Sequence, residues 1–378
     1  MKKMIKLSLV AAVAVAGLTT TASAANLEDA IKGVDVSGMV QYRYEDTNVK
    51  NGASTQLNDY DAEMNVKVPV NDSVTANLKI DVAGDLTDTT ADTGTGDAKP
   101  SVNLEDVYFT YNAGVATVMA GKQNVPGPFS DGAQGTGAVA LVPAGPVTLA
   151  AAYFNMHSVD TEAGAAAVAG LDVTAVAAIA KIGPVDFDIY YADVADTLDL
   201  TSVHAAGTFG PVSVDARYST KDIDNATSTQ DDISLGKITA SMKAGPATVT
   251  AGYATTGDDN GVTIFGTENN TVAIDNDNDA AVDFKVWQAS LGALADADAF
   301  LISAGMPLGP VNASLTYVDV EYNADGGATA NDDASEILAK VVYPMSKNFS
   351  ATVMYSEYET QATGAAKVEI GRASCRER

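Results

Sequence analysis

Cysteine and histidine are almost missing from this chain of 378 residues, which has one cysteine, Cys375, and two histidines, His157 and His204. With so few ligands and nucleophiles, neither a zinc site nor a nucleophilic triad can be assembled. The sequence has no Gly-x-Ser-x-Gly motif, and residues 94–99 (GTGDAK) lack the Gly-Lys-Ser/Thr end of a phosphate loop. These absences predict a protein that is not an enzyme and that carries no cofactor.

Basic residues and long apolar runs are also scarce. The chain has 22 Lys and Arg against 49 Asp and Glu, a formal net charge of -27. An acidic surface repels phosphate backbones, so we expect no nucleic-acid partner. No apolar run reaches the roughly 18 residues of a membrane-spanning helix, which excludes an α-helical membrane protein. The apolar content of 46% is too high for a disordered chain.

The N-terminus has the layout of a cleaved secretory signal. Three lysines within residues 2–6 precede an apolar stretch, residues 7–18, and a small-residue end, Ala22-Ser23-Ala24. This stretch is too short for a membrane anchor. We expect residues 1–24 to be a signal peptide and the mature chain to begin at Ala25.

The C-terminus has an unusual composition. Residues 369–378 (EIGRASCRER) match the in-frame translation of a common short-read sequencing adapter, and they contain the single cysteine. Our hypothesis is that this segment is foreign, so that residues 25–368 form one domain. The alternative is a genuine basic tail.

The remaining chain alternates apolar and polar residues with the period of a β-strand. In residues 34–45 the even positions are apolar or aromatic apart from Gly38, and the odd positions are mostly polar. The same division occurs in residues 60–68 and 74–82. This pattern predicts strands about ten residues long with one face in water.

Short turns and long polar connections alternate between these strands. Gly-Pro pairs supply the turns at residues 145, 183, 210, 245 and 309. The long connections are residues 46–58, 84–101, 122–138, 157–167, 221–230, 257–296 and 323–333. Tight turns at one end and large loops at the other are characteristic of a transmembrane antiparallel β-barrel of the outer membrane.

The predicted fold is therefore all-β, a barrel of about 18 strands. We count seventeen strands up to Tyr358. An even number returns both termini to the periplasm, so we expect the last strand to have been lost. Residues 282–306, which include Trp287, form a near-continuous apolar run, and the alternative there is an additional hairpin.

Periodicity alone does not decide which face is wet, because a soluble sandwich and a wide barrel have opposite assignments. The signal peptide, the loop asymmetry and the aromatic residues near strand ends favour the barrel. A barrel of this size holds water, and the polar faces then line the pore. The predicted wall residues are Arg43, Glu45, Asp61, Glu63, Lys67, Lys79, Asp81, Asp186, Asp188, Asp215, Arg217, Glu336 and Lys340.

Two stretches carry a family resemblance. Residues 105–124 (EDVYFTYNAGVATVMAGKQN) resemble the hairpin before the third loop of Gram-negative porins. With residues 26–32 and 34–44, the chain is most similar to the campylobacter-type major outer membrane porins. The resemblance implies a homotrimer and a third loop folded into the barrel. It places Lys122, Asp131 and Gln134 at the constriction, opposite Arg43 and Lys67. The alternative is a Gly-rich surface loop that only connects strands.

The expected function is passive diffusion of ions and small hydrophilic solutes through the outer membrane, with mild preference for cations because acids exceed bases on the wall. The expected partners are outer membrane lipid and lipopolysaccharide. A structural surface protein, of the S-layer or adhesin kind, is the alternative; an enzyme built on a barrel scaffold is disfavoured by the missing catalytic residues.

A calcium site is the one metal candidate. Asp275, Asp277 and Asp279 have the spacing of the first three ligands of a calcium loop, yet Ala280 replaces the required Gly and Val286 the final Glu. We expect a solvated acidic loop rather than a specific metal site.

Overall fold

The computed structural model describes residues 33–50, 52, 54–88, 101–130, 134–157, 171–224, 232–262, 281–282, 284, 286–287, 289–323, 331–360 and 367–377. They form one sheet of 18 antiparallel strands. The strands are β1 (Asp35–Val49), β2 (Thr55–Asn71), β3 (Val74–Asp88), β4 (Ser101–Asn112), β5 (Thr117–Asn124), β6 (Gln134–Ala144), β7 (Val147–His157), β8 (Val173–Ile182), β9 (Val185–Val194), β10 (Leu198–Phe209), β11 (Val212–Ile223), β12 (Ile233–Ala244), β13 (Ala247–Thr256), β14 (Asp298–Leu308), β15 (Val311–Asn323), β16 (Asn331–Pro344), β17 (Phe349–Thr360) and β18 (Lys367–Glu377).

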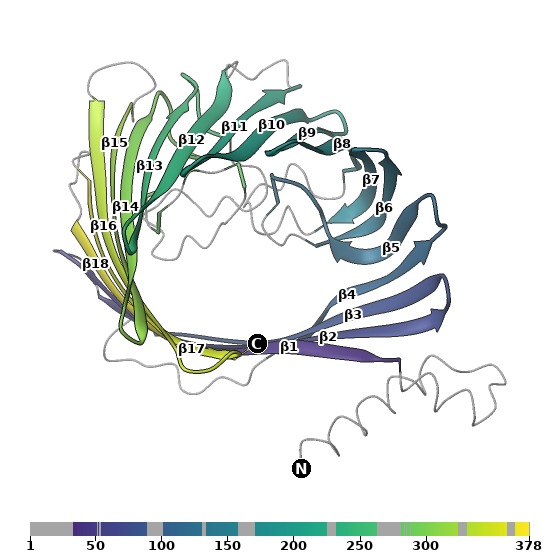
Figure 1. Ribbon diagram of the computed structural model, residues 1–378, viewed down its shortest axis with the longest axis horizontal. Helices are drawn as coiled ribbons and strands as arrows, with labels where there is room; N and C mark the ends of the chain where they lie inside the picture. Colours follow the sequence, from purple (N-terminus) through teal and green to yellow (C-terminus); the bar gives the residue numbers. More distant parts are fainter. Residues whose placement is uncertain are drawn as a thin grey trace, which may run out of the picture.

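Each strand pairs with its neighbours in sequence, and β1 pairs with β18 to close the barrel (Figure 1). The predicted all-β barrel is confirmed. In the described part of the chain, no helix is long and apolar enough to cross a membrane.

The structure has an eighteenth strand, where the sequence predicts seventeen visible strands and a lost closing one. β18 runs antiparallel to both β17 and β1, with register partners from Val40↔Glu377 to Val49↔Val368. Its inward side chains Val368 and Ile370 are buried against other interior residues, which gives this short segment a reason to join the sheet. The sequence count stopped at β17 because the tail was set aside for its composition.

The five Gly-Pro pairs lie in two-residue turns at one end of the barrel. Gly145, for example, has φ 65° and is followed by Pro146. A positive φ at the first turn position suits the right-handed twist of a hairpin, and glycine adopts it without steric cost. At the other end one connection is unexpectedly short: β9 and β10 are joined by residues 195–197, with Asp196 at φ 54°.

The apolar face of the sheet points outward. Val40 is 58% exposed on the outside of β1, whereas Glu45, on the opposite face of the same strand, is 2% exposed. Large apolar side chains are exposed on most of the strands. Such a surface is stable only when lipid covers it, so the barrel assignment is correct and the soluble sandwich is excluded.

The third loop folds inward, as predicted. Residues 125–130 belong to this loop between β5 and β6, and Val125 and Phe129 are buried in the main apolar cluster. The described part of residues 257–297 contains no named strand, so the additional hairpin is not found there. Val262, Val282, Phe284 and Leu291 of this connection join the same cluster.

Candidate channel interior

A group of carboxylates lines the inner face of β2, β3 and β4. Lys79 Nζ lies 3.0 Å from Glu63 Oε1 and 2.6 Å from Glu105 Oε2. The register places Asp61, Asp81 and Asp106 on the same inward face as these groups. These five acids share the inner face with Lys79, which pairs with two of them, and we call this group the acidic wall.

A second polar cluster lies on β9, β10 and β11. His204 Nδ1 and Nε2 lie 2.6 Å from Asp188 Oδ2 and 2.9 Å from Asp215 Oδ2. Arg217 Nη1 donates to Asp188 Oδ1 at 3.2 Å and to Ser202 Oγ at 2.8 Å. Two carboxylates, one guanidinium and one imidazole therefore pair with one another on this part of the wall.

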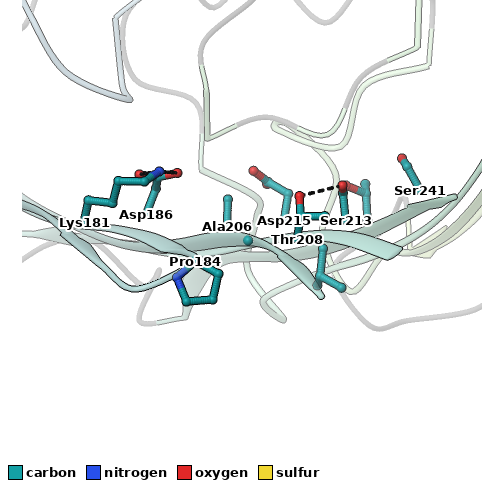
Figure 2. A pocket seen from close by; sticks show the side chains of 11 residues that line it. Lys181, Pro184, Asp186, Ala206, Thr208, Ser213, Asp215 and Ser241 are labelled. Carbon is teal, nitrogen blue, oxygen red and sulfur yellow. Dashed lines mark hydrogen bonds and ion pairs between the residues drawn. The ribbon is translucent and has the colours of Figure 1, made fainter. Parts of the chain in front are cut away.

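Below this cluster, toward the short turns, the wall has an open hollow of about 450 Å³. Figure 2 shows Lys181 and Asp186 paired on its floor, with Asp215 and Ser213 on the same side of the sheet and Pro184 on the other. The Lys181–Asp186 pair is largely exposed, at 66% and 58%. The hollow is therefore a wetted part of the interior rather than an enclosed pocket.

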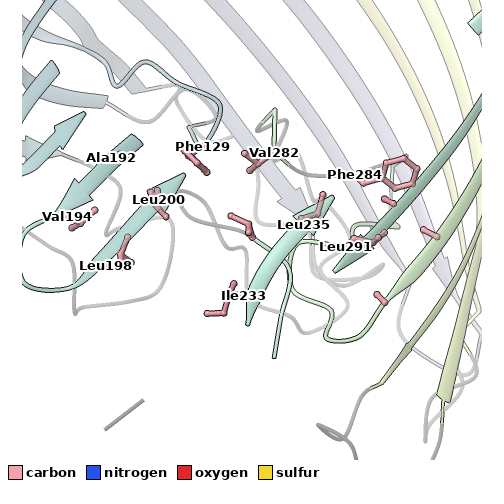
Figure 3. Close-up of a cluster of buried hydrophobic side chains, with 14 of the residues drawn as sticks. Phe129, Ala192, Val194, Leu198, Leu200, Ile233, Leu235, Val282, Phe284 and Leu291 are labelled. Atoms are coloured by element: carbon pink, nitrogen blue, oxygen red, sulfur yellow. The ribbon is translucent and has the colours of Figure 1, made fainter. Parts of the chain in front are cut away.

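Apolar side chains occupy the interior beside the loop ends of β8 to β14. Leu200 and Leu235 point inward there and are fully buried. Figure 3 shows Phe129 of the third loop next to Val282, and the backbone N–H of Val282 donates to the carbonyl oxygen of Pro128 at 3.0 Å. At Gly127 a Cβ would lie 3.9 Å from the Tyr190 ring of β9. The third loop, the described part of residues 281–297 and the barrel wall thus form one apolar cluster. We call this cluster the plug, and it includes Phe129, Leu200 and Leu291.

The second inward segment also reaches the opposite wall. Glu336 of β16 is fully buried, and its Oε2 accepts hydrogen bonds from the backbone N–H groups of Trp287 at 3.2 Å and Ala289 at 2.8 Å. Its Oε1 accepts from Ser356 Oγ of β17 at 2.7 Å. The Arg372 guanidinium lies 4.8 Å from the centroid of the Trp287 ring and donates to Glu45.

The structure places most predicted wall residues on the inward face. Arg43, Glu45 and Arg217 lie there with the residues of the acidic wall. Lys67 and Lys340 also face inward but lie near the short-turn end, so the structure does not bring Lys67 to the third loop.

The predicted constriction residues are not brought together. Lys122 pairs with Val107, which is exposed on the outer face, and its Nζ donates to the carbonyl oxygen of Leu104 at 3.0 Å. Gln134 hydrogen-bonds with Asn124 at the loop ends of β5 and β6. Asp131 lies outside the described residues, as do the calcium candidates Asp275, Asp277 and Asp279. Elsewhere, the described residues contain no group of three His, Cys, Asp or Glu side chains arranged to hold a metal ion.

The residues that sequence reasoning missed are those that hold the inward segments. Val125 and Phe129 stood out less than the charges beside them, although they are what anchors the third loop. The apolar run around Trp287 was noticed but interpreted as a possible hairpin. Glu336 was predicted as one wall charge among many, and nothing in the strand period distinguishes it.

Comparisons with known proteins agree with this architecture. The barrel is similar to Pseudomonas aeruginosa OpdQ (TM-score 0.73, 10% identity, covering 91% of this chain and 98% of that one). It is also similar to P. aeruginosa OpdO (TM-score 0.72, 13%, 93% and 98%) and to Acinetobacter baumannii OccAB4 (0.70, 11%, 91% and 97%). At these identities the likeness shows the fold alone. No curated protein sequence matches the chain.

A family model covers nearly the entire sequence. The model of the Campylobacter major outer membrane protein matches residues 1–376. Together with the closed barrel, this match makes the protein an outer membrane porin. The chain belongs to the Campylobacter major outer membrane protein family.

Proposed function

We propose that this porin is a passive diffusion channel with a mild preference for cations. The observation that carries the proposal is the acidic wall, where five carboxylates share the inner face of β2 to β4 with Lys79. The polar cluster of β9 to β11 holds two carboxylates, Asp188 and Asp215, against one guanidinium, Arg217, so it does not offset this excess.

The physical basis is electrostatic. A wall with more carboxylates than basic groups raises the local concentration of cations and lowers that of anions, and the effect weakens with ionic strength. Because water fills the space, hydrated ions pass without shedding their shells. The plug limits solute size, since its apolar residues occupy part of the cross-section.

Single-channel recording in a planar bilayer under a salt gradient tests this function. We expect stepwise conductance and a reversal potential of cationic sign that shrinks as salt rises. A reversal potential of anionic sign contradicts the preference. No conductance from folded, inserted protein contradicts the channel itself and favours a surface scaffold.

We further propose, by resemblance to the family, a homotrimer embedded in lipid and lipopolysaccharide. The exposed apolar side chains on the outer face are compatible with both lipid and neighbouring copies. Light scattering in detergent, corrected for bound detergent, gives the number of chains. A monomeric mass under conditions that preserve the folded barrel contradicts the trimer.

We also propose that residues 1–24 are removed on export and that residues 369–378 are foreign to the protein. Mass spectrometry of the mature protein is expected to find Ala25 at the N-terminus. Sequencing of the genomic 3′ end tests the second point, and a confirmed Cys375 codon contradicts it.

A further inference from the structure

A second inward segment, in the connection between β13 and β14, is attached to the third loop and to the barrel wall. We call it the crossing segment, meaning the described part of residues 281–297. It meets the third loop through the Val282–Pro128 hydrogen bond and meets β16 through Glu336. It then returns to the wall where Asn323 N–H, at the end of β15, donates to the carbonyl oxygen of Ala295 at 3.0 Å.

The attachments to the plug and to β16 differ in kind. On the plug side the contacts are mainly apolar, through Phe284 and Leu291. Apolar contacts have no fixed direction, so they tolerate shifts of the segment. On the β16 side the contact is directional, because one carboxylate oxygen accepts two backbone N–H groups.

The burial of Glu336 makes this contact consequential. Its neighbours on the inner face of β16, Leu338 and Ala334, are apolar and buried. A carboxylate removed from water is costly unless its oxygens are hydrogen-bonded, and here both accept bonds. If the segment left, the carboxylate and two backbone N–H groups would lose these partners together.

We propose that Glu336 is a positioning residue that fixes the crossing segment in the channel and thereby sets the largest solute that passes. The inference rests on the proposed diffusion function. It assigns size selection to a buried wall carboxylate that touches no solute, and charge selection to the separate acidic wall.

The chain contains a built-in reporter for this contact. Trp287 is its single tryptophan, and its ring is buried beside Leu338, Val368 and Ile370. Intrinsic fluorescence of the folded full chain therefore reports the place of the crossing segment without any channel measurement. Glu336→Leu removes both acceptor oxygens and is expected to shift Trp287 emission to longer wavelength and raise acrylamide quenching several-fold.

The size limit is measured on the same protein by liposome swelling with sugars of increasing size. Glu336→Leu is expected to admit sugars that the parent excludes. Glu336→Gln keeps an oxygen for the two N–H groups and an amide that can donate to Ser356 Oγ, so it should retain the parental emission and size limit. If Glu336 only stabilised the barrel, folded Glu336→Leu and Glu336→Gln would have the same Trp287 emission and the same size limit.

A second variant acts from the loop side. Ala289→Pro removes one donor without altering the barrel wall, and it should move both readouts in the direction of Glu336→Leu. Folding is checked by the migration of unheated and heated samples on a gel; if Glu336→Leu does not fold, Ala289→Pro alone decides. Unchanged Trp287 quenching together with an unchanged size limit in a folded variant overturns the inference. Absence of swelling with the parent protein overturns the proposed function instead, so the two failures are distinguishable.

Discussion

The inner faces of β10 and β2 differ in the polarity of their side chains. On β10 the inward side chains change from Leu198 and Leu200 near the loop end to Ser202 and His204 farther down. On β2 the described inward side chains, Asp61, Glu63, Asn65 and Lys67, are polar throughout. The difference follows what each strand faces, because a folded loop covers the upper part of β10 and water wets β2. On these two strands, inward apolar residues therefore mark where a folded loop covers the wall.

Leu200→Ala should have the largest effect, a loss of thermal stability, because it truncates a fully buried side chain of the plug. Loss of burial and the cavity left behind cost about 2–5 kcal/mol in a close-packed site. The midpoint of the thermal transition in detergent measures the change. Thr201→Ala, the next residue on the outer face, is the control and should stay within roughly 0.5 kcal/mol of the parent. Equal shifts in both variants would mean that the plug does not stabilise the barrel.

Glu63→Lys should have the next largest effect, on charge selection. It changes the acidic wall by two unit charges, and each is worth about 1 kcal/mol for an ion passing at 4 Å in water. We expect the cation-to-anion permeability ratio to fall by up to roughly tenfold at low salt, read from the reversal potential. Asp319→Asn is the matched control, since this carboxylate pairs with outward Phe300 on the far side of the sheet. A similar change in the control would attribute selectivity to net charge and not to the wall.

The comparison of the two faces also explains what the sequence could predict. Alternation along β1 and β2 identifies strands and their faces because each strand's environment repeats every two residues. The Gly-Pro turns are equally local, since glycine permits the positive φ that the turn needs. These local signals were sufficient for the barrel and seventeen of its strands, whereas the eighteenth followed from parity and the inward third loop from the family resemblance.

The interior contacts could not be predicted in the same way. Glu336 and Trp287 are 49 residues apart, and their contact depends on where a long connection folds. The strand period says only that Glu336 faces inward. Lys122 shows the opposite error: its charge suggested the constriction, but its pairing with Val107 puts it on the outer face. A charge near an inward loop is not evidence that it faces the pore.

Asp188→Asn tests the polar cluster of β9 to β11, and its effect on thermal stability should be smaller than that of Leu200→Ala. The substitution removes the charge to which Arg217 and His204 are bonded, in a place where these side chains are mostly buried. Loss of charge-assisted hydrogen bonds of this kind costs about 1–3 kcal/mol. Thermal stability should fall, while the permeability ratio should change less than in Glu63→Lys, because Asp188→Asn changes the wall by one unit charge and Glu63→Lys by two. A shift in selectivity as large as that of Glu63→Lys would place the ion path along β9 to β11.

Lys181→Met should have the smallest effect on thermal stability. It tests whether an exposed ion pair contributes less than a buried one. Lys181 Nζ lies 2.7 Å from Asp186 Oδ1, a shorter contact than the 3.2 Å between Arg217 and Asp188. Distance alone would rank the Lys181 pair as the stronger one. Its two side chains are largely exposed, however, so water and salt screen the attraction, and exposed pairs contribute about 0–1 kcal/mol. We therefore expect a thermal midpoint close to that of the parent at moderate salt. A destabilisation equal to that of Asp188→Asn would mean that the hollow is closed to water, and that the open channel begins above it.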